Sequence, residues 1–157
     1  MPTRRPAPLA LVLAVISALA ASGCVTEDLT FDPGLKPGAE GVTAVIEVYA
    51  AGIATGDGPL ACSLTSAAAQ QALIDRSGSD GNCLAAVAAI AERLPDDAAV
   101  ALRELKVGDI TGAETTSASA SITLTGPGAD AARAVLGGVT FQMSVTDARW
   151  GIDSVQP

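Results

Sequence analysis

The 157-residue sequence predicts an α+β fold, in which helices come first and an antiparallel sheet follows. Two observations predict this order. Apolar residues recur with helical spacing between about residues 42 and 94, whereas apolar and polar residues alternate in several segments after residue 97. The change of period therefore divides the chain into helices followed by an antiparallel sheet.

The first 23 residues have the layout of a secretory signal peptide. Arg4 and Arg5 give a positive start, and an apolar run of about 13 residues extends from Leu9 to Ala21. This run is shorter than the roughly 20 residues that a membrane-spanning helix needs. A retained transmembrane anchor is therefore the weaker interpretation.

The signal ends in Ala21-Ser22-Gly23-Cys24, which resembles a bacterial lipobox, where cleavage leaves an acylated cysteine as the first mature residue. The alternative is ordinary cleavage after Ala20, because Ala18-Leu19-Ala20 fits the A-x-A rule. The cysteine count favours lipidation, since acylation of Cys24 leaves Cys62 and Cys83 to pair without a stranded thiol. We therefore expect acyl chains on Cys24 to hold the protein on the extracytoplasmic face of the cell membrane.

The mature chain is strongly acidic. Removal of the signal leaves 7 basic and 17 acidic residues, a net charge of −10. This charge argues against nucleic-acid binding and against electrostatic docking on anionic lipids. Residues 24–39 contain Pro33-Gly34 and Pro37-Gly38 and predict a flexible linker, so residues 40–157 are expected to form a single domain.

Four helices are expected in the first part of this domain. The first has an apolar face and ends at Gly56; the face consists of Val42, Val45, Ile46, Tyr49 and Ile53. Asp57 is expected to cap a short second helix that begins near Pro59 and carries Cys62, and Thr65 or Ser66 to cap a run over 67–75. Another helix begins near Cys83 and ends at Pro95, with one face made by Leu84, Val87, Ile90 or Ala91, and Leu94.

Strands are expected after residue 97. Val100, Leu102, Leu105 and Val107 suggest a first strand, with a bulge between the two pairs. Residues 116–125 alternate between an apolar face and a face of Ser and Thr, which could also serve as a docking surface. Residues 126–138 form a connection with about one helical turn over 131–135. Two further strands carry Val139, Phe141, Met143 and Val145, and then, after a turn at 146–148, Trp150, Ile152 and Val155.

The chain contains no histidine, which excludes Ser-His-Asp and Cys-His nucleophiles. Cys62 and Cys83 lack further metal ligands and lie too far apart for a C-x-x-C redox motif, so a structural disulfide is predicted. The loop over 75–82 is only a weak match to a calcium loop, because its twelfth position is Ala86 instead of an acid. No catalytic residue, metal or cofactor is therefore assigned.

Three segments resemble the nuclear transport factor two-like superfamily, in particular its secreted lipoprotein members in high-GC Gram-positive bacteria. They are Ala54-Thr55-Gly56-Asp57, the following short helix with Cys62, and Arg149-Trp150-Gly151-Ile152. The resemblance covers about residues 39–155. It implies a cone, formed by a curved sheet around helices, with a pocket at the open end. It also implies the pairing of Cys62 with Cys83 and dimerisation through the sheet.

A non-catalytic function is the preferred hypothesis: the domain binds a small apolar ligand in the cone, or an envelope protein on its sheet. The candidate pocket residues are the bulky inward-facing ones, Tyr49, Phe141, Met143 and Trp150. One alternative is an envelope enzyme of the ketosteroid isomerase or polyketide cyclase type, which would use carboxylates and Tyr49, the only tyrosine. The other is a purely structural envelope protein.

Overall fold

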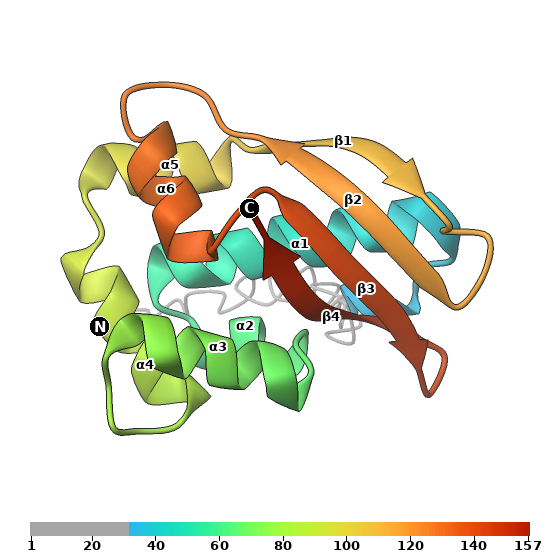
Figure 1. Cartoon of the computed structure of the whole chain (residues 1–157), viewed down its shortest axis with the longest axis horizontal. Helices are drawn as coiled ribbons and strands as arrows, with labels where there is room; N and C mark the ends of the chain where they lie inside the picture. The colour runs from blue at the N-terminus through green and yellow to red at the C-terminus, as the bar shows by residue number, and fades with distance from the viewer. Residues whose placement is uncertain (1–31) are drawn as a thin grey trace, which may run out of the picture. The chain divides into compact units, whose positions relative to one another are not determined.

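The computed structural model describes the unit formed by residues 32–157. This unit is α+β, with six α-helices and one four-stranded antiparallel sheet (Figure 1). The expected signal peptide and Cys24 lie outside the described residues. Within the described part, every helix is too short or too polar to span a membrane.

The helices begin and end largely where local capping residues place them. They are η1 (Pro33–Leu35, a 3-10 turn), α1 (Gly38–Thr55), α2 (Gly58–Ser63), α3 (Ala67–Ser77), α4 (Cys83–Arg93), α5 (Asp96–Arg103) and α6 (Ala129–Leu136). The side chains of Asp57, Ser66 and Asn82 each accept a hydrogen bond from the backbone N–H three residues later. Gly56 adopts a left-handed conformation (φ 74°) and ends α1. These observations confirm the predicted stop of the first helix and the caps at Asp57 and Ser66.

The sheet has the simple order β1-β2-β3-β4, with every neighbouring pair antiparallel. Its strands are β1 (Lys106–Thr111), β2 (Ser117–Thr123), β3 (Thr140–Thr146) and β4 (Arg149–Gln156). The predicted tight turn between the last two strands is confirmed. Asp147 and Ala148 both have positive φ, at 52° and 62°, which is the backbone twist that two-residue hairpins require.

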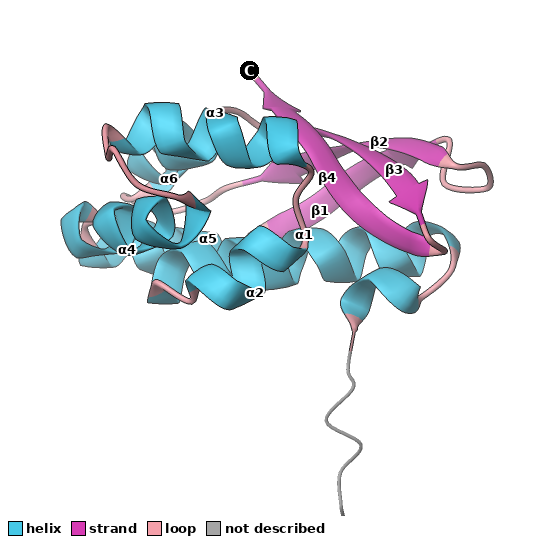
Figure 2. Cartoon of the chain, turned by 90° about the horizontal axis from the view of Figure 1, so that it is seen from below, coloured by secondary structure: helices cyan, strands magenta, loops and turns pink. Residues whose placement is uncertain are grey.

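The hydrophobic core lies between α1 and the inner face of the sheet. Figure 1 shows α1 crossing behind the strands, and Figure 2 shows the helices on one side of the sheet and beyond its end. The apolar face predicted for the first helix is buried, as are the inward residues of β2, β3 and β4: Ala118, Ala120, Ile122, Phe141, Met143, Trp150 and Ile152. No helix of the described part covers the opposite face of the sheet (Figures 1 and 2).

The strand predicted from Val100 to Val107 is wrong for most of its length, because α5 occupies residues 96–103. Pro95 stands at its N-cap and Asp96 and Asp97 fill its first turn, where acids favour a helix. Its buried side is made of Ala98, Ala101 and Leu102, and Leu105 just after the helix is buried too, while Val100 is 42% exposed. The strand itself begins only at Lys106, and its irregular register lies between Val107 and Ile110.

The second half of the expected linker is folded onto the domain. Asp32 pairs with Arg149 (Oδ2 to Nε, 2.6 Å), and η1 buries Pro33 and Gly34. The reason is a long-range contact: a Cβ at Gly34 would lie 2.7 Å from the backbone oxygen of Trp150. Only Gly allows so close an approach, and the folded region therefore includes residues 32–39 in addition to 40–157.

Two smaller differences concern the helices. α6 has eight residues, against the single turn expected over 131–135, because Ala132 and Leu136 bury one side of it against the core. Leu84, expected on the inner face of α4, is 46% exposed, whereas Val87 and Ile90 are buried as predicted. At the N-terminus of α4 it is Cys83 that faces inward.

Candidate functional site

The four candidate pocket residues lie inside the packed core. Tyr49, Phe141, Met143 and Trp150 are at most 5% exposed. The rings of Tyr49 and Phe141 meet edge to face, with centroids 6.1 Å apart and planes at 79°. The structure thus brings Tyr49 and Phe141 together as core neighbours, in contact with each other and closed to solvent.

The hydroxyl of Tyr49 is paired with an arginine, not with an acid. Burial raises the pKa of Tyr49 to about 12, and the charge of Arg76 and its hydrogen bond to the hydroxyl oppose this shift. An isomerase of the type considered above would need a carboxylate beside the tyrosine. The arrangement observed here instead satisfies a buried hydroxyl.

The raised pKa predicts a loss of stability at high pH. Folding raises the pKa of Tyr49 from 10.0 to about 12. The contribution of its neutral hydroxyl to the free energy of unfolding is therefore complete below pH 10 and disappears as the pH rises from about 10 to 12. Over this interval the free energy of unfolding should fall by about 1.4 kcal/mol per pH unit, and Tyr49→Phe should remove that slope. Tyr49 is the only tyrosine, so tyrosinate absorbance reports it alone; a midpoint near pH 10 in the folded protein would contradict the prediction.

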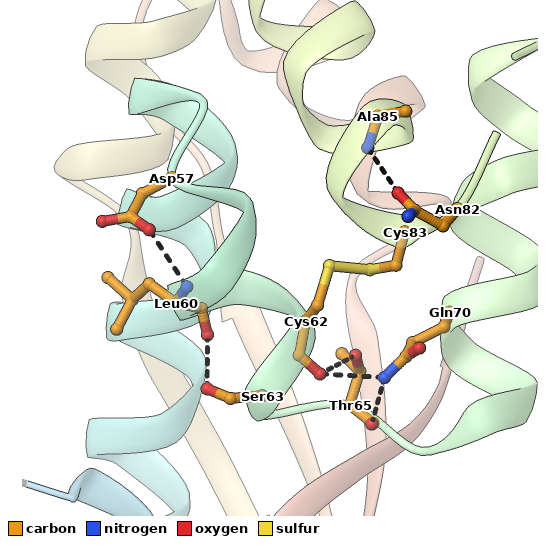
Figure 3. The surroundings of a disulfide bond; sticks show 9 residues. All are labelled: Asp57, Leu60, Cys62, Ser63, Thr65, Gln70, Asn82, Cys83 and Ala85. Carbon is orange, nitrogen blue, oxygen red and sulfur yellow. Dashed lines mark hydrogen bonds between the residues drawn. A yellow bond between two sulfur atoms is a disulfide. The ribbon is translucent and has the colours of Figure 1, made fainter.

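A disulfide joins Cys62 in α2 to Cys83, the first residue of α4, with their Cα atoms 6.1 Å apart (Figure 3). Beside it, the Gln70 side chain of α3 donates hydrogen bonds to the carbonyl oxygens of Cys62 (2.9 Å) and Thr65 (3.2 Å). The bond and the two hydrogen bonds fasten α2, α3 and α4 to one another. This position in the core is that of a structural disulfide.

Of the predicted loop over 75–82, residues 75–77 are the end of α3 and residues 78–82 form the turn to α4. Gly78 is left-handed (φ 64°), and the Ser77 hydroxyl accepts a hydrogen bond from the backbone N–H of Ser79 at 3.0 Å. Asp75 instead accepts a hydrogen bond from Gln71. Across residues 32–157, no three Cys, Asp or Glu side chains gather where they could hold a metal ion.

A hollow of about 290 Å³ lies where the ends of α3, α4 and α6 meet, and the sequence did not predict it. Two arginines line it together with apolar side chains; the full lining is Arg76, Ile90, Arg93, Leu94, Pro95, Ala134 and Val135. The only signal in the sequence was that Arg76 and Arg93 each fall in the last turn of a helix. These positions in the sequence do not show that the two helix ends lie together in the fold.

The uncovered side of the sheet forms a second candidate surface, here called the open face. We define it by the eight outward residues of the two central strands: Ser117, Ser119, Ser121, Thr123, Thr140, Gln142, Ser144 and Thr146. All eight are uncharged; five of them are half-buried and the other three are exposed. Gln142 donates a hydrogen bond to the Ser119 hydroxyl across the strands at 3.1 Å.

The chain was compared with known proteins in three ways. Neither the protein-family models, nor the curated proteins, nor the solved structures give a match. The fold class and the geometry of the two surfaces therefore rest on the residues of this chain alone.

Proposed function

We propose that this chain is a lipid-anchored protein of the cell envelope, attached to the extracytoplasmic face of the membrane through Cys24. Its domain has a non-catalytic role: it binds a partner protein on the open face, and that partner is a second copy of the same chain. The single observation that carries the binding role is the uncovered, uncharged open face on an otherwise acidic molecule.

Support for the anchor comes from the sequence and from the cysteines. The disulfide uses Cys62 and Cys83, which leaves Cys24 as the one remaining cysteine of the chain. Because Asp32 is already folded onto the domain, only residues 25–31 would separate an acylated Cys24 from it. Seven extended residues reach at most about 25 Å, so the domain would stand close to the bilayer.

Membership in the nuclear transport factor two-like superfamily is part of the proposal. The order of helices before the sheet and the position of α1 against the inner face of the sheet support it. The sheet would then form the cone around α1. Because Phe141, Met143 and Ile152 fill its interior, the filled core favours binding on the outside over an apolar ligand or an isomerase reaction inside.

Charge is the argument for a second copy as partner. Residues 32–157 carry 15 acidic and 7 basic side chains, so most ways of bringing two copies together place carboxylates against carboxylates. The two central strands present hydroxyl and amide groups alone to the solvent. Two copies can meet there without opposing like charges.

The proposal is tested on chain extracted from membranes. Intact mass should show a mature protein that begins at Cys24 and carries acyl groups; a chain that begins at Ala21 without added mass would overturn the anchor. Native mass spectrometry in detergent should show a dimer. Ser119→Glu combined with Ser144→Glu should weaken dimerisation by at least about tenfold, because like charges then face each other.

Ser79→Glu is the matched control, since it adds an acid to the loop between α3 and α4 and should leave the dimer unchanged. A monomer at every concentration would overturn self-association. A stable complex with a different envelope protein that the double substitution abolishes would also overturn the second copy as the partner.

A further inference from the structure

We propose that the hollow between α3, α4 and α6 is a binding site for a small carboxylate with an apolar body, whose carboxylate the guanidinium groups of Arg76 and Arg93 hold. This site is separate from the open face, and it does not depend on self-association. Its argument rests on how the two arginines are positioned, on the absence of an acid beside them, and on the apolar remainder of the lining.

Both guanidinium groups are held in place by uncharged partners. Arg93 donates from Nε to the backbone oxygen of Ala89 (2.9 Å) and from Nη2 to that of Ser77 (2.5 Å). Arg76 bonds the Tyr49 hydroxyl and lies so close to Gly137 that a Cβ there would be 2.6 Å from Nη1. Both guanidinium groups thus have partners on the domain before a ligand arrives, which lowers the entropic cost of binding.

The charge of these two arginines has no counterpart among the described residues. Arg133, Arg149 and Lys36 each form an ion pair with a carboxylate, whereas no carboxylate of residues 32–157 lies within ion-pair distance of either arginine in the hollow. Two further hollows on the domain are lined by basic side chains, and both also contain Glu47. An anion in the hollow would supply the missing counterpart of this charge.

The rest of the lining indicates what kind of group the ligand carries besides its carboxylate. Ile90 is 5% exposed, and Leu94 and Val135 are half-buried around the two arginines. A hydrated inorganic ion would leave these apolar side chains in contact with water, whereas a short aliphatic or aromatic body would cover them. Two guanidinium forks also suit the two oxygens of a carboxylate, which they can bind with paired hydrogen bonds.

The test is isothermal titration calorimetry on the membrane-extracted chain in lipid nanodiscs, with empty nanodiscs as the blank. The probe is 3-phenylpropanoate, and its neutral analogue is 3-phenylpropanamide. We expect the carboxylate to bind and the amide to bind at least about tenfold more weakly, because hydrogen bonds to charged groups are the stronger ones. Binding should weaken as salt is added.

Arg93→Gln should weaken binding of 3-phenylpropanoate by at least about tenfold. Arg133→Gln is the matched control, because this arginine of α6 lies outside the hollow in an exposed ion pair, and it should bind as the wild type does. The proposal is overturned if the amide binds as well as the carboxylate, if Arg93→Gln has no effect while the protein stays folded, or if inorganic phosphate competes as well as the probe.

Discussion

Replacing Phe141 with alanine is expected to lower the free energy of unfolding by about 3–5 kcal/mol. Phe141 is fully buried in β3, between Ala120 of β2 and Val155 of β4, and its ring packs edge to face on Tyr49. Small neighbours cannot move to fill the space of a lost ring, so a cavity remains and adds its own cost. Urea denaturation followed by the fluorescence of Trp150, the only tryptophan, measures the loss.

Gln142→Ala provides the control, because Gln142 is the next residue of the same strand and points to the open face. It should change the free energy of unfolding by no more than about 1 kcal/mol, the value of one hydrogen bond. A loss below about 1 kcal/mol for Phe141→Ala would mean that the interior is not packed as a core. Such a result would instead support the prediction from the sequence that Phe141 lines a pocket.

The features that could be predicted from the sequence are those that depend on neighbours along the chain. A cap such as Asp57 needs only the N–H three residues later, and Gly56 needs only its own backbone freedom to end α1. The alternation in β2 likewise follows from the chain itself, because successive side chains of a strand point to opposite faces. These features set the order of helices and strands.

α5 shows where such reasoning fails. Val100 and Leu102 suggested alternation, but the residues that decide its buried side are Ala98 and Ala101, which are too small to stand out in a hydrophobic pattern. Packing against neighbouring elements makes alanine the suitable residue where space is limited. The helical spacing of the buried residues in α5 can therefore be recognised only once the elements that pack against them are known.

The folded start of the domain and the arginine hollow could not be predicted from the sequence, for a related reason. Asp32 pairs with Arg149, a residue 117 positions later, and Arg76 and Arg93 line one hollow only because the ends of α3, α4 and α6 lie together. Nothing in the spacing of these residues indicates such contacts. They arise from tertiary structure, which also explains why the candidate pocket predicted from bulky residues and the hollow observed in the structure share no residue.

Removing the disulfide is expected to cost about 3 kcal/mol of the free energy of unfolding. Cys62 and Cys83 close a loop with a sequence separation of 21, which contains all of α3. The cost arises chiefly in the unfolded chain, which gains freedom when the loop is opened. Cys62→Ala combined with Cys83→Ala suits the two buried positions, because it leaves no polar group unsatisfied there. Urea denaturation without reductant compares this variant with the wild type.

The wild type in the presence of a thiol reductant is the matched control, and its loss should equal that of the double variant to within about 0.5 kcal/mol. Equal losses would show that the cost belongs to the cross-link and not to the packing of the sulfur atoms. A loss below about 1 kcal/mol would contradict the loop argument. The same samples connect the disulfide to the proposed anchor, because a denatured, unreduced wild type should show no free thiol if Cys24 is acylated. One thiol per chain would mean that Cys24 is unmodified, whatever the disulfide contributes to stability.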